Sequence, residues 1–319
     1  MILKKENRVL SFRKEKIEVV YHYYLCEDSG EQFEDDQLSD LNITQVYNKY
    51  RERLRLPFPD EISAIREKFG LSARKMSDIL GFGPNTYGNY EKGEIPSKAN
   101  GRLIQLASDP VEFRKLAHLS GNLSKTLNRR IDELMYSDNA DDLQNLSFIF
   151  KKEPPTRYSG YSIFKQEKVN QMILFFAMKM KPWKTKLNKL LFYTDFLHYK
   201  NYGYSISGLR YVAINFGPVP DEYEILFTIG RIDNVFKKSY QVINDDATGE
   251  KILPMKNAKL NTDIFNKNEL DCLNRVYNKF VNISSSGIVE MSHNEPAWKD
   301  NYKKNRFIDY NYGFQLIHV

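Results

Sequence analysis

The chain has 319 residues, of which 41% are hydrophobic and 13% aromatic, a composition typical of globular domains and not of a disordered protein. Its net charge of +6, from 47 basic and 41 acidic residues, is mild for a nucleic-acid binder, so charge alone does not predict one. The two cysteines are too far apart to form a disulfide framework, no apolar stretch approaches the roughly 20 residues of a membrane span, and the N-terminus lacks the apolar core of a signal peptide, so we expect a cytoplasmic protein.

The first 25 residues alternate loosely between apolar and polar side chains, which predicts a small β-structure. Ile17 and Val19 would share one face of a strand. A helix over roughly Asp40–Leu54 is expected next, because apolar residues recur there at helical spacing. Pro57 and Pro59 would end it and begin the following segment.

Residues 60–94 have the pattern of three short helices separated by tight turns. Gly70 would end the first helix, since glycine takes the left-handed conformation at a helix C-terminus at little cost. Ser72 is a good N-cap for the second helix. Pro84 would begin the third, which runs to Glu91, because the first helical position needs no N–H donor. The apolar residues expected to face inward are Ile62, Ile65, Phe69, Met76, Ile79, Leu80 and Tyr87.

The third helix carries an amide-rich polar face made of Asn85, Thr86 and Asn89. Such a face is typical of a helix-turn-helix whose last helix enters the DNA major groove. Asparagine can pair bidentately with adenine, so we expect an operator half-site that contains A·T pairs. The alternative is a small helical core with a solvated outer face. The residues predicted to contact DNA are Ser72, Arg74, Lys75, Asn85, Thr86, Asn89 and Lys92.

Two stretches of this segment, Ser72–Ser77 and Asn85–Gly93, resemble the Xre/Cro-type helix-turn-helix family. The second stretch is most similar to MqsA-type antitoxins, in which the last helix runs into a Tyr-Glu-Lys-Gly turn. The resemblance implies that Asn85 and Asn89 stand at positions that contact bases. Arginine is common at the second position, so the operator sequence of the family does not carry over.

In MqsA-type antitoxins the region before the helix-turn-helix is a zinc-binding module. Here Cys26 stands at the first position of its second Cys-x-x-Cys pair, Ser29 replaces the partner cysteine, and no upstream pair exists. Zinc needs about four ligands, and His22 nearby does not complete a set. We therefore predict a small β module without a metal ion and, for the whole chain, no cofactor.

Three further helices are expected after Gly93, over Lys98–Ala107, Val111–Leu119 and residues 123–135. They would cover the helix-turn-helix and could supply the face of a homodimer. Ser137–Tyr158 is the best candidate for a linker, because it combines an acidic run with a Lys-Lys-Glu-Pro-Pro break.

The remaining sequence predicts a second domain, mainly helical with a few short strands. Its expected elements are helices over 169–180, 187–199 and 270–280, a strand over Tyr211–Ile214 followed by a turn at Gly217-Pro218, a hairpin made by Tyr240–Ile243 and Lys251–Leu253, and a loop with a short helix over Ser284–Trp298.

Three separated pieces of this domain resemble one family, the Panacea (SocA-like) antitoxin domain. They are Lys186–Phe196, Gly203–Val219, and Ser292-His293 with Trp298 after it. The resemblance implies a mainly α-helical domain with a small antiparallel sheet. It also implies direct binding of a protein toxin, and a SocA-like member can instead deliver its toxin to a protease.

Aromatic side chains make good binding anchors, because they bury much area at a small entropic cost. The side chains predicted at the toxin contact are Tyr193, Phe196, Tyr199, Tyr211, His293 and Trp298. The alternative for the aromatic run between Leu190 and Tyr199 is a place in the core. The lysines between Lys179 and Lys189 form either a solvated face or one that attracts an acidic toxin.

Two pairs of titratable residues could be considered for catalysis, Asp195 with His198 and His293 with Glu295. No nucleophile with an adjacent base, no HExxH and no glycine-rich phosphate loop accompanies them. A structural hydrogen bond is the simpler role for His293, and we expect no enzymatic activity.

The sequence thus predicts a mainly α protein with small β elements (α+β class). The expected boundaries are 1–56 for the β module and its helix, 57–136 for the helix-turn-helix domain, 137–158 for the linker, and 159–319 for the Panacea domain. The expected function is that of a type II antitoxin that binds a toxin encoded nearby and represses its own operon. The alternative is a ligand-responsive or phage-type repressor without a toxin partner.

Overall fold

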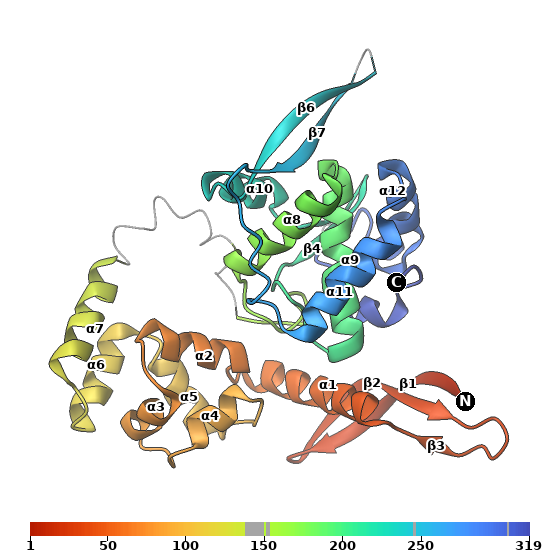
Figure 1. The fold of residues 1–319 in the computed structure, drawn as a ribbon. Coiled ribbons are helices and arrows are strands. Elements are labelled where there is room, and N and C mark those ends of the chain that lie inside the picture. The colour runs from red at the N-terminus through yellow and green to blue at the C-terminus, as the bar shows by residue number, and fades with distance from the viewer. Residues whose placement is uncertain (138–149, 151–153, 245–246, 305) are drawn as a thin grey trace. The chain divides into compact units, whose positions relative to one another are not determined.

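The computed structural model describes residues 1–137, 150, 154–244, 247–304 and 306–319. The chain divides into two compact units, residues 1–148 and 149–319. Both are mainly helical with small antiparallel sheets, so the predicted α+β class is confirmed (Figure 1). Most of the predicted linker, residues 138–149 and 151–153, lies outside the described residues. Among the helices that are described, none combines the length and apolarity needed to cross a bilayer.

The first unit begins with a long β-hairpin. Strands β1 (Ile2–Phe12) and β2 (Glu15–Leu25) pair antiparallel along their whole length, and the short β3 (Gln32–Phe33) pairs with the end of β2. The two turn residues, Arg13 and Lys14, both have positive φ, as in the tight turns that match the twist of a hairpin. The predicted β-structure of the first 25 residues is therefore a hairpin of two strands, whose turn consists of two basic residues and contains no glycine.

Helix α1 (Asp36–Leu54) packs on β2 through an apolar core, in which Ile17 and Val19 of the strand meet Val46 and Tyr50 of the helix. The helix begins four residues before the predicted start, because the side chain of Asp35 caps it by accepting a hydrogen bond from the backbone N–H of Leu38.

Two amide side chains of α1 close the outer edge of β2. Asn42 accepts from the backbone N–H of His22 at 2.9 Å and donates to its carbonyl at 2.8 Å. Gln45 bonds both backbone groups of Val20 in the same way, at 3.1 and 2.8 Å. The amides thus take the place that a neighbouring strand would occupy, and they satisfy backbone groups that would otherwise face an edge.

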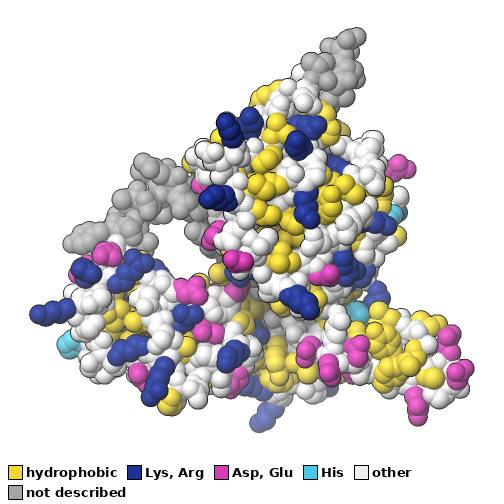
Figure 2. Space-filling view, viewed as in Figure 1, with side chains coloured by type: hydrophobic (Ala, Val, Ile, Leu, Met, Phe, Trp, Pro, Cys, Tyr) yellow, Lys and Arg dark blue, Asp and Glu magenta, His cyan; other side chains and the backbone are white. Residues whose placement is uncertain are grey.

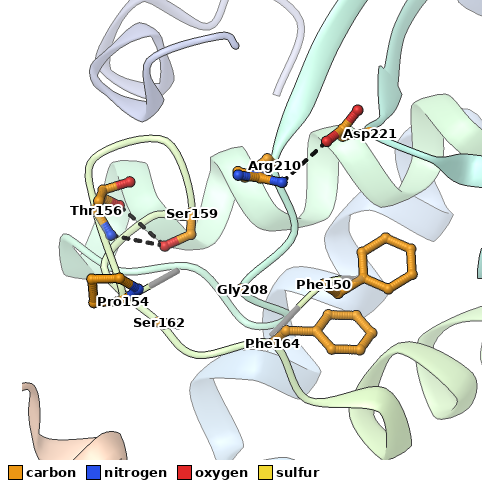
Figure 3. Close-up of a pocket in the computed structure, with 9 residues that line it drawn as sticks. All are labelled: Phe150, Pro154, Thr156, Ser159, Ser162, Phe164, Gly208, Arg210 and Asp221. Atoms are coloured by element: carbon orange, nitrogen blue, oxygen red, sulfur yellow. Dashed lines mark hydrogen bonds and ion pairs between the residues drawn. The ribbon is translucent and has the colours of Figure 1, made fainter. Parts of the chain in front are cut away.

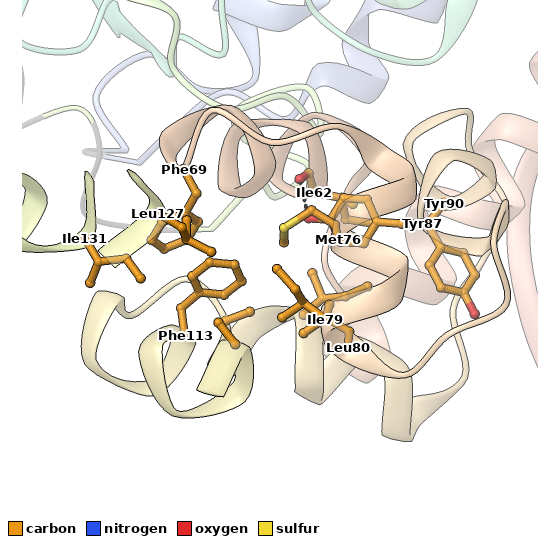
Figure 4. Packing of buried hydrophobic residues seen from close by; sticks show 13 residues of the cluster. Ile62, Phe69, Met76, Ile79, Leu80, Tyr87, Tyr90, Phe113, Leu127 and Ile131 are labelled. Carbon is orange, nitrogen blue, oxygen red and sulfur yellow. Dashed lines mark hydrogen bonds between the residues drawn. The ribbon is translucent and has the colours of Figure 1, made fainter. Parts of the chain in front are cut away.

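Six helices follow in the described part of the first unit: α2 (Pro59–Lys68), α3 (Ala73–Leu80), α4 (Thr86–Glu91), α5 (Lys98–Leu106), α6 (Pro110–Leu119) and α7 (Lys125–Ser137). Their apolar faces meet in one core (Figure 4). At its centre the rings of Phe69 and Phe113 stack with their centroids 3.9 Å apart. Ser72 caps α3 as predicted, accepting a hydrogen bond from the backbone N–H of Lys75.

The start of α4 differs from the prediction. Pro84 lies in the turn before the helix, and Asn85 is the N-cap residue. The backbone N–H of Thr86 bonds to the carbonyl of Gly83 at 3.0 Å, which makes Pro84 the second residue of a β-turn. The fixed φ of proline suits that position as well as it suits a first helical turn, so sequence alone does not separate the two.

The second unit is built around helix α9 (Lys184–Tyr202), which is buried on nearly every side. Helices α8 (Gln166–Met180), α11 (Lys267–Phe280) and α12 (Ser285–Asn294) pack around it, together with the 3₁₀ helix Tyr310–Gln315 (Figure 1). Apolar residues lie on all sides of α9, as expected for a helix inside a domain, and buried polar residues such as Lys189 and Asp195 lie among them. The predicted helices at 169–180, 187–199 and 270–280 correspond to α8, α9 and α11.

Two β-hairpins flank this helical core. In the first, β4 (Tyr211–Ile214) pairs with β5 (Gly217–Pro220), so the turn is at Asn215-Phe216 and the predicted turn at Gly217-Pro218 is wrong. Those two residues begin a strand because Gly217, at φ +96°, is held between two other elements, as described below. The second hairpin, β6 (Phe236–Asn244) with β7 (Ala247–Pro254), confirms the prediction and is longer than expected.

Two helices of the second unit were not predicted as separate elements. Helix α10 (Tyr223–Ile232) lies between the hairpins in the chain, and its apolar face, with Leu226 and Phe227 fully buried, carries a helical signal that was not recognised in the sequence. Helix α13 (Pro296–Lys299) is a single turn after α12.

Candidate functional site

In the first unit, the polar residues predicted to read bases lie together on the exposed side of α4. Asn85 and Asn89 are exposed, and Thr86 is half-buried. The opposite side of the helix is fixed in the core by Tyr87, whose hydroxyl donates to the carbonyl of Ile62 at 2.8 Å. The polar face is therefore presented outward on a rigidly held helix.

Further contacts fix both ends of α4. The backbone N–H of Tyr87 donates to the buried Ser77 hydroxyl of α3 at 3.1 Å. At the other end, Arg66 Nε is 2.6 Å from a carboxylate oxygen of Glu91. That ion pair is partly shielded from solvent, and it raises the pKa of Arg66 through its hydrogen bond with Glu91.

Of the remaining residues predicted to contact DNA, three are exposed and one is bound to another side chain of the protein. Ser72, Arg74 and Lys92 are exposed near α4. Lys75 is different, because its ammonium group is 2.6 Å from the amide oxygen of Asn122 and holds α3 to the loop before α7. Residues 60–102 carry seven Lys or Arg and six Asp or Glu, and on the face seen in Figure 2 basic and acidic side chains are mixed.

In the second unit, four of the six predicted toxin contacts lie in the core. Tyr193, Phe196, Tyr199 and Tyr211 are each at most 1% exposed. The rings of Tyr193 and Phe280 stack at 4.6 Å, and those of Phe196 and Tyr310 at 4.3 Å. These aromatic residues pack α9 against its neighbours, so the prediction that they anchor a partner at the surface is wrong.

The other two predicted contacts, His293 and Trp298, belong to a group that we call the aromatic stack, together with Tyr302. The centroids of His293 and Trp298 are 4.0 Å apart, and those of Trp298 and Tyr302 are 4.4 Å apart, with interplanar angles of 21° in both pairs. All three rings are partly exposed. They present aromatic surface that is already ordered by mutual stacking.

The aromatic stack is tied to the tip of the β4–β5 hairpin. Trp298 Nε1 donates to the carbonyl of Ile214 at 2.8 Å, and the Tyr302 hydroxyl donates to Asn215 Oδ1 at 3.0 Å. Phe216, at the same tip, is 66% exposed. Neither Phe216 nor Tyr302 was predicted. Two sequence features could have pointed to them. Phe216 is an aromatic residue beside a predicted turn, and Tyr302 follows Trp298 by four residues.

The hairpin reaches this position because Gly217 passes close to two buried side chains. A Cβ atom at Gly217 would lie 2.4 Å from Ser292 Oγ and 2.6 Å from Lys189 Cε. Lys189 is fully buried, and burial lowers its pKa to about 7. Burial, and then the neighbouring Lys189, also lower the pKa of His293.

The other lysines of the predicted basic run do not form one solvated face. Lys184 lies 2.7 Å from carboxylate oxygens of both Glu224 and Glu250, and so joins α10 and β7 to α9. Lys186 donates to the carbonyl of Ile283 at 2.5 Å. Lys179 lies over the rings of Phe175 and Tyr277. Most of the run therefore holds the domain together.

Asp195 and His198, considered as catalytic groups, are both fully buried. Asp195 Oδ1 accepts from the backbone N–H groups of Ile206 and Ser207, both at 3.0 Å, and Oδ2 accepts from Ser207 Oγ at 2.5 Å and from the Tyr211 hydroxyl at 2.7 Å. Burial raises the pKa of Asp195 to about 6, although these hydrogen bonds act to lower it. His198 Nδ1 is bonded to the carbonyl of Tyr204 at 2.7 Å. Both residues therefore hold the loop over residues 204–207 against α9.

Two hollows lined by described residues of the second unit could be considered as substrate sites. The first, lined by residues such as Ser159, Phe164 and Arg210, has a volume of about 30 Å³, which admits a water molecule or two and no substrate (Figure 3). The second, about 370 Å³, is open, and its polar side chains already pair with one another, as Arg306 does with Asn301 and Tyr312 with Asp300.

Comparison with known proteins gives one finding. Residues 187–299 match the family model of the antitoxin SocA-like Panacea domain. The match extends from α9 to α13 and includes Asp195, Gly217, His293 and Trp298. No curated protein matches the chain, and no solved structure does. The second unit thus contains an antitoxin-like domain, which supports a role of the toxin–antitoxin type.

The carboxylate of Asp195 makes the stability of the protein depend on pH in a defined direction. Its pKa is about 6 in the folded chain against 3.8 for an ordinary aspartate, so folding favours the protonated form. The stability of the wild type relative to Asp195→Asn should therefore fall by about 2 kcal/mol as the pH rises from about 4 to about 6. Urea unfolding of both proteins across this range measures it, and a constant difference would refute the assignment.

Replacing Gly217 should destabilise the second unit. Gly217→Ala adds a Cβ into Ser292 and Lys189 at a positive φ, which we expect to cost about 2–4 kcal/mol. Thermal unfolding by circular dichroism is the measurement. Gly121→Ala is the control, since Gly121 also has a positive φ but faces open space, and its cost should be about 1 kcal/mol. Equal losses for the two variants would mean that the close contact is unimportant.

Proposed function

We propose that this chain is the antitoxin of a type II toxin–antitoxin system, which neutralises a protein toxin by direct binding and represses its own operon. The observation that carries the proposal is the match of residues 187–299 to an antitoxin domain. The proposed protein makes and breaks no covalent bond, needs no cofactor, and works in the cytoplasm, where the toxin is made.

The toxin contact is proposed at the aromatic stack and the tip of the β4–β5 hairpin. Phe216 offers an exposed apolar anchor, and the neighbouring rings are held in place before any partner binds. Preorganised aromatic surface binds with a small entropic loss, and such residues carry much of the energy of protein interfaces. Exposed lysines lie close to it in the chain, Lys299, Lys303 and Lys304, which favours an acidic toxin surface.

The DNA contact is proposed at α4, with α3 and α4 as a helix-turn-helix. The outward polar face and the firm attachment of α4 support this role. Asn85, Thr86 and Asn89 would contact base edges, and Ser72, Arg74 and Lys92 would contact phosphates. Lys75 is placed less well for this, because Asn122 already holds it. A homodimer would bind two half-sites about 34 Å apart.

Toxin binding and operator binding can influence each other. If the toxin changes the affinity of the dimer for DNA, then DNA changes the affinity for the toxin by the same factor. A variant of the proposal has the second unit deliver the toxin to a protease, in which case the half-life of the toxin shortens when this chain is present. The rival function is a repressor without a toxin, and a harmless neighbouring gene product would favour it.

The DNA proposal predicts the effect of removing two amides. Asn85→Ala with Asn89→Ala should weaken binding to the DNA upstream of the gene by about 1–3 kcal/mol for each base that is no longer recognised. Binding of labelled DNA at fixed salt concentration is the measurement. Thr126→Ala, exposed on α7, is the control and should bind normally. If the double variant binds as the wild type does, α4 does not read the operator.

The toxin proposal predicts that loss of the exposed Phe216 ring weakens toxin binding, whereas loss of the exposed Ile232 side chain does not. Phe216→Ser should weaken binding to the toxin by about 2 kcal/mol or more, and cells that express both proteins should grow poorly. Ile232→Ser is the matched control, because Ile232 is likewise an exposed apolar side chain, 61% exposed at the last residue of α10. Normal binding and rescue by the Phe216 variant would place the toxin contact elsewhere.

A further inference from the structure

Strand β1 lies at the edge of its sheet, and among the described residues β2 is the strand that pairs with it. The two strands pair from Ile2 to Phe12 of β1 without a bulge. The other edge of the sheet is closed, by β3 and by the amide side chains of Asn42 and Gln45. Within the described residues, no further strand or bridge pairs with β1. One side of this sheet is therefore sealed by the protein itself, and the other is not.

The sequence of β1 protects this edge only through charge. Proteins blunt exposed edges with charged side chains, proline, bulges or short strands. β1 carries Lys4, Lys5, Glu6 and Arg8, but it has no proline and no bulge and is eleven residues long. It exposes apolar side chains on both faces, with Ile2 40%, Leu3 48% and Val9 60% exposed. Figure 2 shows hydrophobic side chains gathered over the strands of this unit. A strand with an open backbone and apolar side chains is suited to pairing with another strand.

We propose that β1 pairs antiparallel with β1 of a second copy of this chain, which joins the two sheets across a two-fold axis at Asn7. A two-fold axis perpendicular to the sheet pairs residues whose numbers have an even sum, since facing residues must point to the same side. The register centred on Asn7 uses all eleven residues. It would add about ten backbone hydrogen bonds between the two copies.

Charge complementarity selects this register. With Asn7 on the axis, Glu6 of each copy faces Arg8 of the other, and Ile2 faces Phe12. Moving the axis to Glu6 brings two glutamates face to face, and moving it to Arg8 brings two arginines together. Opposite charges across a strand pair stabilise it, and like charges destabilise it. The strand is therefore complementary to itself in the register with the greatest overlap.

This pairing deepens the proposed function, since it rests on the same dimer that a two-fold operator requires, but it needs neither DNA nor toxin. Sedimentation velocity of the full chain without DNA thus tests it separately. The wild type should sediment as a dimer. Arg8→Glu and Glu6→Arg should each raise the dimer dissociation constant roughly tenfold or more, because each places like charges opposite one another at two positions.

Mixing the two variants distinguishes a defect in the dimer interface from a defect in folding. In an equimolar mixture, Glu6 and the new acid of the first variant face the two basic residues of the second, so a mixed dimer should form with about the wild-type stability. The Arg8–Glu6 pair within each strand stays broken in the mixture, so restored folding cannot explain such a rescue. Leu119→Asp is the control, since Leu119 is 82% exposed on α6, and it should leave the dimer intact.

A disulfide cross-link tests the register of the proposed strand pair. In a Cys26→Ser background, Asn7→Cys should form a disulfide-linked dimer on mild oxidation, because facing Cα atoms at the axis lie within about 5.5 Å. Lys5→Cys places the two sulfur-bearing residues about 13 Å apart along the strands and should not cross-link. A monomeric wild type, an unchanged dimer in Arg8→Glu, loss of the dimer in Leu119→Asp alone, or cross-linking only at position 5 would each overturn the proposal.

Discussion

The arrangement of the second unit depends on the buried carboxylate of Asp195. It receives four hydrogen bonds from Ile206, Ser207 and Tyr211, and so ties α9 to the loop that leads into the β4–β5 hairpin. A buried carboxylate without such donors would cost several kcal/mol, and donors without the carboxylate would be left unpaired. Neither partner is stable without the other, so the direction in which the hairpin leaves the core is fixed.

The surface proposed for the toxin follows from that constraint. The hairpin passes over Lys189 and Ser292 at Gly217, and its tip meets Trp298 and Tyr302. The side chains available to a partner are therefore determined by the core beneath them. The first unit uses the same principle, because Tyr87 and the Arg66–Glu91 pair hold α4 so that its amides face outward. In both units, buried polar contacts position exposed side chains.

Much of the fold could be predicted from the sequence, because helical periodicity, caps and glycines act locally. Ser72, Gly70 and the apolar stripes of α8, α9 and α11 are examples. The turn at Asn215-Phe216 could not be predicted, since Gly217 takes its positive φ in β5 beside Lys189 and Ser292, which are far away in the chain. The burial of the aromatic residues of α9 also could not be predicted from the sequence. Tyr193 and Phe196 satisfy the pattern of an interface and that of a core equally, and only the surrounding helices decide between them.

The central claim is that the second unit binds and masks a protein that is harmful when made alone. The most direct measurement is expression of the neighbouring gene by itself and together with this full chain, followed by size-exclusion chromatography of the co-expressed pair. We predict growth arrest in the first case, normal growth in the second, and elution of the two proteins as one stoichiometric complex. A harmless neighbour, or rescue without a complex, would contradict the claim.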